Sequence, residues 1–267
     1  MLRTAQFEDL SIITTGRGIF GQYLYLVYCY LLEDLLIDTG TLLSQEPLLK
    51  FLKDKKLNTV VNTHAQEDHI GNNRALTTKR DVVLYAHKEA IKWIEDPRLL
   101  NLRAYQRIMW GEPYPSNPDE IPDEIKTKSY SLEVIPTPGH CMGHICLYEP
   151  SKKWLFSGDL NVGKLSLMTN PFVDLLQTLV SLRKLSKYDV SEIFCAHIGH
   201  LTNGNAIIQK KLTFLEEAKA QAEKLYSEHV LLIEVVKEVA GRESFLKVIT
   251  RGHLSNLNGI KSLLSLK

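Results

Sequence analysis

The sequence predicts an α+β fold in which two β-sheets pack face to face between outer helices, a four-layer αββα sandwich. Strand-like and helix-like segments alternate in two successive halves of the 267-residue chain, and each half begins with strands spaced as in antiparallel hairpins. In addition, polar residues of metal-binding type repeatedly follow the predicted strands. Loops beyond strand ends are where side chains from several elements can meet at one point.

The first half of the chain contains strands rich in aromatic and β-branched residues. They are predicted over Leu10–Thr14, Tyr23–Tyr30, Asp34–Ile37, Thr59–Asn62 and Val82–Tyr85. Helical periodicity predicts helices over Ser44–Lys53, Asn72–Thr78 and His87–Ile94. Residues 96–122, here called the insertion, carry Trp110 and five prolines, which predicts a helix followed by an irregular loop.

The second half repeats the pattern and ends in helices. Strands are predicted over Tyr130–Ile135, His144–Tyr148, Lys153–Phe156 and Glu192–Ala196, and helices over Val173–Leu185 and Asn205–Ser227. Residues 228–267 show no strand pattern and are predicted as two or three short helices. We therefore expect a catalytic domain over residues 1–227 and a small C-terminal helical extension over residues 228–267, serving as a cap or a dimer element.

The composition is that of an ordinary globular protein, with 44% hydrophobic and 24% charged residues. A formal net charge of +1 argues against nucleic-acid binding and favours a small-molecule substrate. No signal peptide or membrane span is predicted, so the expected location is the cytoplasm, and a homodimer is compatible with the pattern. The cysteines form no Cys-x-x-Cys pair and are expected to be reduced; they are Cys29, Cys141, Cys146 and Cys195.

The most informative segment connects a predicted strand to a predicted helix. It reads Asn62-Thr63-His64-Ala65-Gln66-Glu67-Asp68-His69-Ile70-Gly71-Asn72. Two imidazoles, the carboxylate of Asp68 and a carboxamide fall within six residues, and a loop can turn several of them onto one point. Imidazole and carboxylate ligands suit zinc, iron or manganese.

Three further strand ends carry residues of the same type. The segments are Pro136-Thr137-Pro138-Gly139-His140, Phe156-Ser157-Gly158-Asp159 and Phe194-Cys195-Ala196-His197. Taken alone, a histidine such as His140 is more often a packing or surface residue. Four sets of metal-binding residues that all follow strands instead indicate one shared metal site.

Together these segments resemble the metallo-β-lactamase superfamily, whose signature is His-x-His-x-Asp-His followed by a His, an Asp and a last His. The resemblance spans about residues 10–200 and implies that superfamily's αββα fold. It implies a first metal site of His64, Gln66 and His140, a second of Asp68, His69 and His197, and Asp159 as a bridge between them. It also implies that Asp38 supports the metal-binding loop without touching the metal.

The chain departs from this signature at Gln66, where most members have histidine. An amide oxygen is a weaker and harder ligand than imidazole. Three interpretations are open at this stage. Gln66 is a weak ligand, or the first site is poorly occupied, or the site prefers another metal such as iron or manganese.

The activity implied by the resemblance is hydrolysis by a metal-bound hydroxide, with one or two divalent ions as cofactor. Zinc is the expected ion, with iron and manganese as alternatives. Asp68 is expected to orient the hydroxide and to pass a proton to the leaving group. The expected substrate is a small-molecule ester, thioester, lactone or phosphodiester. A ribonuclease and an iron-binding redox or non-hydrolytic member of the fold are the alternatives.

Overall fold

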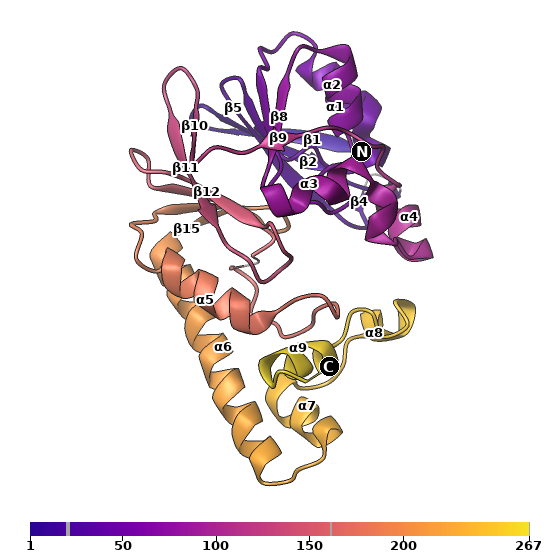
Figure 1. Ribbon diagram of the computed structural model, residues 1–267, viewed down its shortest axis with the longest axis vertical. Helices are drawn as coiled ribbons and strands as arrows, with labels where there is room; N and C mark the ends of the chain where they lie inside the picture. The colour runs from indigo at the N-terminus through magenta and orange to yellow at the C-terminus, as the bar shows by residue number, and fades with distance from the viewer. Residues whose placement is uncertain (20–21, 161, 267) are drawn as a thin grey trace.

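The computed structural model describes residues 1–19, 22–160 and 162–266 and confirms the predicted four-layer sandwich (Figure 1). The first sheet is antiparallel from β1 to β6 and parallel from β6 to β9. Its strand order is β1 (Leu2–Phe7), β2 (Leu10–Thr15), β5 (Val27–Leu32), β6 (Leu35–Ile37), β7 (Thr59–Val61), β8 (Val83–Ala86) and β9 (Asp119–Glu120). A separate hairpin pairs β3 (Gly18–Ile19) with β4 (Gln22–Tyr23).

The second sheet contains one parallel pair, β13 with β14, and is otherwise antiparallel among the strands described. Its order is β10 (Glu124–Lys126), β11 (Ser131–Pro136), β12 (Ile145–Glu149), β13 (Trp154–Gly158), β14 (Glu192–Cys195) and β15 (Gly199–Thr202). Both sheets therefore begin with hairpins, in agreement with the pattern of the sequence.

Side-chain alternation along the strands builds the layers. In β5, Tyr30 and Leu32 pack between the sheets, whereas Cys29 and Leu31 pack against the outer helices. Successive strand residues point to opposite faces, so a strand buried on both sides reads as a continuous apolar run. Between the sheets, the rings of Phe156 and Phe194 stack with centroids 5.0 Å apart.

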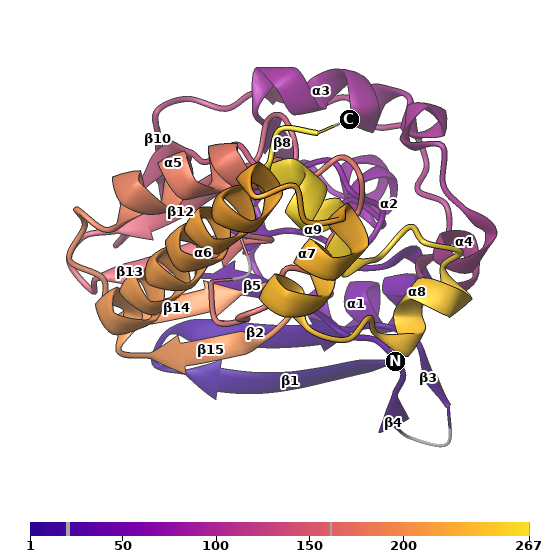
Figure 2. The ribbon, with the colours of Figure 1, turned by 90° about the horizontal axis from the view of Figure 1, so that it is seen from below.

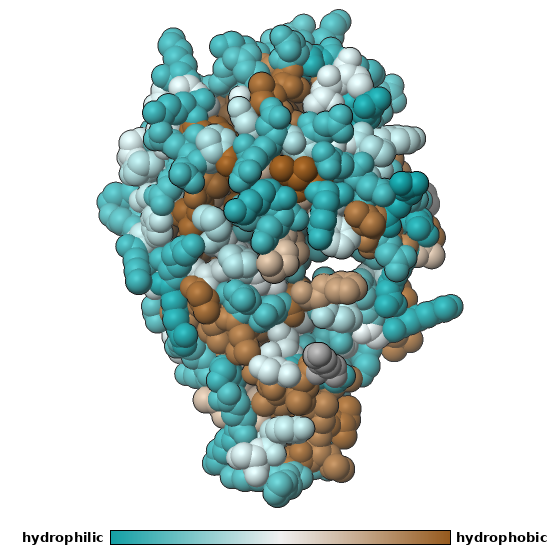
Figure 3. Space-filling model, in the orientation of Figure 1, coloured by the Kyte–Doolittle hydropathy of each residue, from teal (hydrophilic) through white to brown (hydrophobic). Residues whose placement is uncertain are grey.

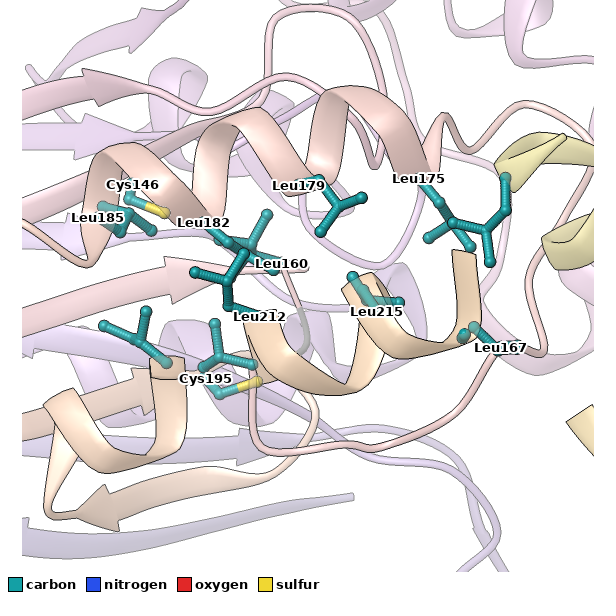
Figure 4. Close-up of a cluster of buried hydrophobic side chains, with 14 of the residues drawn as sticks. Cys146, Leu160, Leu167, Leu175, Leu179, Leu182, Leu185, Cys195, Leu212 and Leu215 are labelled. Atoms are coloured by element: carbon teal, nitrogen blue, oxygen red, sulfur yellow. The ribbon is translucent and has the colours of Figure 1, made fainter. Parts of the chain in front are cut away.

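Helices cover the outer face of each sheet. The first sheet is covered by α1 (Gln45–Leu52) and α2 (Asn73–Lys79), and the second by α5 (Leu175–Leu185) and α6 (Gly204–Ser227) (Figure 2). Figure 4 shows leucines of α5 and α6 turned toward each other, with Cys146 of the second sheet beside Leu185 and Cys195 near Leu212. Burying apolar area in this way is the main stabilising contribution, about 25 cal/mol for each Å² removed from water.

Three short helices form the C-terminal extension, as predicted: α7 (Leu232–Ala240), α8 (Phe245–Ile249) and α9 (Asn256–Leu263). Apolar side chains of α7 and α9 belong to the same buried cluster as α5 and α6. The extension also exposes apolar residues on α7 and α8, and hydrophobic surface gathers over the lower part of the face drawn in Figure 3. None of the helices in the described ranges has the length and hydropathy needed to cross a membrane.

Some elements differ from the sequence-based prediction. Strand β1 was not predicted because it is an exposed edge strand whose side chains show no alternating burial. The predicted strand Tyr23–Tyr30 is wrong in its first half, since residues 24–26 leave the sheet before β5 begins at Val27. The insertion contains the predicted helix, α4 (Ala104–Trp110), which follows α3 (Lys88–Glu95) and precedes the short strand β9.

One lysine lies inside the outer helical layer. Lys211 of α6 has 4% of its surface exposed, and its Nζ donates to the carbonyl oxygen of Lys164 at 2.6 Å. Burial, followed by the charge of Lys164, lowers the pKa of Lys211 from 10.5 to about 8. The unfolded chain therefore binds more protons than the folded chain between pH 8 and 10.5, and stability rises with pH across that window.

Replacing Lys211 with methionine is expected to raise the free energy of unfolding at pH 7 by about 1–3 kcal/mol, because one pKa unit corresponds to about 1.4 kcal/mol. The change should also abolish the rise in stability between pH 8 and 10.5. Urea unfolding of metal-saturated protein at several pH values measures both effects. Lys210→Met, at an exposed neighbouring position, is the control. A wild-type stability that does not rise across this window contradicts the prediction.

Candidate metal centre

The histidine-rich loop lies between β7 and α2 and is fastened to the first sheet by Asp38. The Asp38 carboxylate accepts hydrogen bonds from the amide and the hydroxyl of Thr63, both at 2.8 Å. Its Oδ2 also lies 2.8 Å from Nδ1 of His69. Asp38 adopts the left-handed backbone conformation, with φ +59°, directly after β6. This uncommon conformation is held by buried hydrogen bonds that fix the loop and the orientation of one imidazole.

Two groups of three side chains come together at this edge of the sandwich. His64, His140 and Asp159 form the first group, in which the ligand atoms all lie within 4.8 Å of one another. Asp68, His69 and His197 form the second group, within the same limit. These are six of the seven residues expected to bind metal. The second group has the three members expected of the second site, and the first group contains His64 and His140 of the expected first site together with Asp159.

Asp159, a member of the first group, also contacts the second group. Its Oδ2 is 2.9 Å from Nε2 of His197 and 3.6 Å from Nε2 of His140. Its Oδ1 is 3.3 Å from Nε2 of His69. One carboxylate thus contacts imidazoles of both groups, which is the arrangement of a ligand shared by two ions.

The donor set fits divalent metal ions. Nε2 of His64 and Nε2 of His140 are buried and have no hydrogen-bond partner among the described residues. Buried polar nitrogens are normally paired, and a pair of unpartnered imidazole nitrogens beside a carboxylate is readily explained by a metal ion. The two groups are therefore candidate His/Asp sites consistent with a binuclear centre, and their chemistry does not by itself select the metal.

Burial and neighbouring charges set the protonation of these groups. Burial, and then the proximity of His69, hold the pKa of His64 well below its ordinary value, which leaves the imidazole neutral as a ligand must be. Burial opposes ionisation of Asp159, but the positive charges of protonated His197 and His69 outweigh it and hold the pKa of the carboxyl well below its usual range. A neutral imidazole and an ionised carboxylate are the forms that bind zinc.

His144 fixes the backbone of Asp159. Its Nε2 lies 3.0 Å from the backbone nitrogen of Asp159, which donates to it, and its Nδ1 lies 3.1 Å from the carbonyl oxygen of Thr137. Nδ1 therefore carries the proton. Gly158 makes room for this contact, because a Cβ there would lie 2.7 Å from the His144 ring and its φ is +47°.

Gln66 lies in the same loop and is half-buried. The backbone carbonyl oxygen of Gln66 accepts hydrogen bonds from the backbone amides of His69 and Ile70 at 2.9 and 3.1 Å, which closes the turn that carries Asp68 and His69. The side-chain amide of Gln66 makes no hydrogen bond with any residue in the described ranges. The amide is therefore not committed to another protein partner.

Sequence reasoning missed Tyr25, which the structure brings to the second group. The Tyr25 hydroxyl lies 3.2 Å from Oδ2 of Asp68 and 3.1 Å from Nε2 of His197. The ring of Trp110, from the insertion, packs edge-on against Tyr25 with centroids 4.8 Å apart. The run of apolar and aromatic residues around Tyr25 predicted a strand. In the structure β4 ends at Tyr23 and β5 begins at Val27, so Tyr25 lies outside the strands, where it can reach the second group.

Helix α4 links the metal-binding loop to the C-terminal extension. Gln106 donates to the carboxyl of Glu67 at 2.8 Å, and the Tyr105 hydroxyl lies 2.7 Å from Nδ1 of His253. Burial, and then the charge of Asp68, raise the pKa of Glu67 to about 7. In Figures 1 and 2, α4 and the segment around α8 lie on the same side of the molecule. The insertion and the extension therefore meet beside the metal centre.

A model of the metallo-beta-lactamase superfamily matches residues 23–197 of this chain. The chain belongs to this superfamily. With the two His/Asp groups in place, it is a metallo-hydrolase of the metallo-β-lactamase superfamily. The matched range includes the loop of His64–His69 and ends at His197, so it contains both candidate sites.

The similar proteins include hydroxyacylglutathione hydrolases. Over 223 residues the chain is 22% identical to the hydroxyacylglutathione hydrolase of Pelagibacter ubique, a match covering 81% of this chain and 85% of that protein. It is 29% identical over 178 residues to the hydroxyacylglutathione hydrolase of Thermosynechococcus vestitus, covering 64% of this chain and 63% of that protein.

Solved structures show the same fold. A metallo-beta-lactamase family protein from Thermus thermophilus is 19% identical with a TM-score of 0.69, covering 97% of this chain and 92% of that one. A metallo-beta-lactamase from Pontibacter korlensis is also 19% identical, with a TM-score of 0.64, and covers 81% of this chain and 99% of its own. The Thermus match covers nearly the whole of this chain, so it includes helices of the C-terminal extension.

Proposed function

We propose that this metallo-hydrolase cleaves small-molecule thioesters of the hydroxyacylglutathione type with zinc as its metal. The observation that carries the proposal is the pair of His/Asp groups joined by Asp159. The substrate class is supported by similarity to hydroxyacylglutathione hydrolases over 81% of this chain. Neutral imidazoles together with carboxylates suit zinc.

In this proposal each group of side chains has one task. His64 and His140 would hold the first ion, the group of Asp68, His69 and His197 would hold the second, and Asp159 would contribute to both. A bound zinc ion would lower the pKa of its water from 15.7 to about 7 and polarise the thioester carbonyl. Asp68 would orient the attacking water by accepting its hydrogen bond, take up a proton from it and pass that proton to the sulfur as the C–S bond breaks. Asp38 fixes the His69 ring through Nδ1 and so sets the direction of Nε2.

We further propose that residues 1–227 form the catalytic domain and that residues 228–267 complete the substrate-binding surface beside it. The contact of Tyr105 with His253 supports this division of roles, because it joins the insertion to the extension next to the metal-binding loop. Burial of His253 lowers its pKa, and Arg103 lies close enough to lower it further. A guanidinium in this position suits the carboxylates of a glutathione thioester.

The proposal predicts preferential release of thiol from a hydroxyacylglutathione. With zinc-loaded protein, kcat/KM for this thioester is expected to exceed that for a lactone or a phosphodiester by at least about 100-fold, or roughly 2.7 kcal/mol of transition-state stabilisation. A thiol-reactive dye follows the reaction. The same acyl group on a small neutral thiol is the matched control for recognition of glutathione.

The outcomes separate the alternatives. Faster turnover of the lactone or the phosphodiester contradicts the thioester proposal while leaving the metal centre intact. Cleavage of a single-stranded RNA, with binding that weakens steeply as salt rises, supports the ribonuclease alternative instead. Equal rates on the two thioesters contradict recognition of the glutathione part.

A further inference from the structure

Tyr25 reaches the candidate metal centre from a segment that belongs to neither sheet. Residues 24–26 lie between β4 and β5, and the Leu26 carbonyl oxygen lies 3.3 Å from Nδ1 of His197. The Tyr25 hydroxyl lies within 3.2 Å of Oδ2 of Asp68 and of both ring nitrogens of His197. A phenol in this place touches two of the three side chains of the second group.

The hydrogen of this hydroxyl has one available acceptor when the site is loaded. His197 would then bind the ion through Nε2, which lies 2.9 Å from Oδ2 of Asp159, and would carry its proton on Nδ1, 3.3 Å from the Leu26 carbonyl oxygen. Neither ring nitrogen can accept from Tyr25 in that state. The hydroxyl therefore donates to Oδ2 of Asp68. Oδ2 also lies 3.8 Å from Nε2 of His197, and Oδ1 lies 3.8 Å from Nε2 of His69.

The ring of Tyr25 is held from the other side by the insertion. Trp110, with 8% of its surface exposed, packs edge-on against it at 4.8 Å. The buried indole nitrogen of Trp110 has no hydrogen-bond partner among the described residues, so no polar contact of its own fixes this residue. Its packing against Tyr25 and, at 5.9 Å, against Tyr105 is what links α4 to the second group.

We propose that Tyr25 is a positioning residue for Asp68: its hydroxyl holds Oδ2 and so fixes the carboxylate in the orientation in which Asp68 would bind the second metal ion. Trp110 keeps the phenol in place. The inference rests on the proposed metal-binding role of Asp68. Hydrogen bonds to ligand side chains typically change metal affinity or activity by about 10–100-fold, which sets the size of the expected effect.

Tyr25→Phe tests this with zinc itself as the probe. It removes the hydroxyl and keeps the ring against Trp110. Competition with a chromophoric chelator is expected to show one of the two zinc ions bound about 10-fold more weakly and the other unchanged. kcat on the thioester is expected to fall about 10-fold with KM within about twofold of wild type. Tyr23→Phe is the matched control, because among the described residues the Tyr23 hydroxyl bonds to the Thr14 carbonyl and not to a residue of either metal-binding group.

Trp110→Leu is expected to weaken the same ion, with no additional loss when it is combined with Tyr25→Phe, because both changes act through one hydroxyl. Wild-type affinity for both ions in Tyr25→Phe overturns the inference. So does equal weakening of both ions, which indicates general loosening of the site. Asp68→Asn is measured in parallel: if it also keeps both ions, the proposed metal assignment has failed, whereas loss of an ion there alone refutes only the role of Tyr25.

Discussion

Alanine at Asp68 is expected to remove one of the two metal ions and to slow hydrolysis by more than about 100-fold. Asp68 is buried, with 4% of its surface exposed, and supplies the carboxylate of the group that it forms with His69 and His197. Loss of a residue that only orients a ligand costs about 10–100-fold, so loss of a direct ligand should cost more. Metal analysis of protein purified without added metal gives the stoichiometry, and thiol release gives the rate.

Several variants make this result specific. His69→Ala removes an imidazole from the same group and is expected to lose the same ion. Asp159→Ala is expected to weaken both ions, because the Asp159 carboxylate contacts imidazoles of both groups. Asp81→Ala removes an exposed carboxylate and should change neither metal content nor rate. If Asp68→Ala and His69→Ala both keep wild-type metal content, the second site has been assigned to the wrong residues.

The convergence of the candidate ligands was predictable because their positions follow from topology. His64 and Asp68 come after β7, Asp159 comes directly after β13, and His197 comes two residues after β14. Strand ends that face one edge of a packed sandwich bring such residues together whatever the exact bounds of the strands. Residue type and place relative to a strand were therefore sufficient to predict that these residues come together. Their division into two sites came from the resemblance to the superfamily.

Tyr25 could not be predicted by the same argument. It lies in a run of apolar and aromatic residues whose composition favours a strand, but in the structure residues 24–26 lie outside the strands and Tyr25 contacts residues far along the chain. Those contacts include Trp110 and His197, which lie 85 and 172 positions further along the chain. Long-range packing of this kind overrides local propensity and leaves no local pattern in the sequence.

The strands and helices likewise divide into elements that the local sequence predicts and features that depend on long-range packing. Strand β5 was predictable from its apolar run because it is buried on both faces. Strand β1 was not, since the polar side chains of an exposed edge strand carry little periodic information. The three helices of the extension were predicted as elements, but their docking onto α5 and α6 depends on packing among residues far apart in the chain.

Gln66 is the position at which this chain departs from the signature of its superfamily, and it should make the two sites unequal. The first group has two imidazoles, His64 and His140, together with the shared Asp159. An amide oxygen in place of a third imidazole is a weaker ligand. We therefore propose that the first ion binds about 10–100-fold more weakly than the second, of the order seen when a ligand's environment is altered.

Titration of metal-free protein with zinc should accordingly proceed in two steps. Gln66→His supplies an imidazole and is expected to bring the two affinities together, because it gives the first group a third nitrogen ligand. Gln209→His is the control, since Gln209 is exposed on α6 and its amide bonds to Thr213 rather than to a residue of the metal-binding loop. Activity can rise if polarisation of the carbonyl limits the rate, or fall if the reaction needs an open position on the first ion, so binding is the decisive readout. Equal and tight affinities in the wild-type protein, unchanged by Gln66→His, would mean that Gln66 is not at the metal or that another residue takes its place.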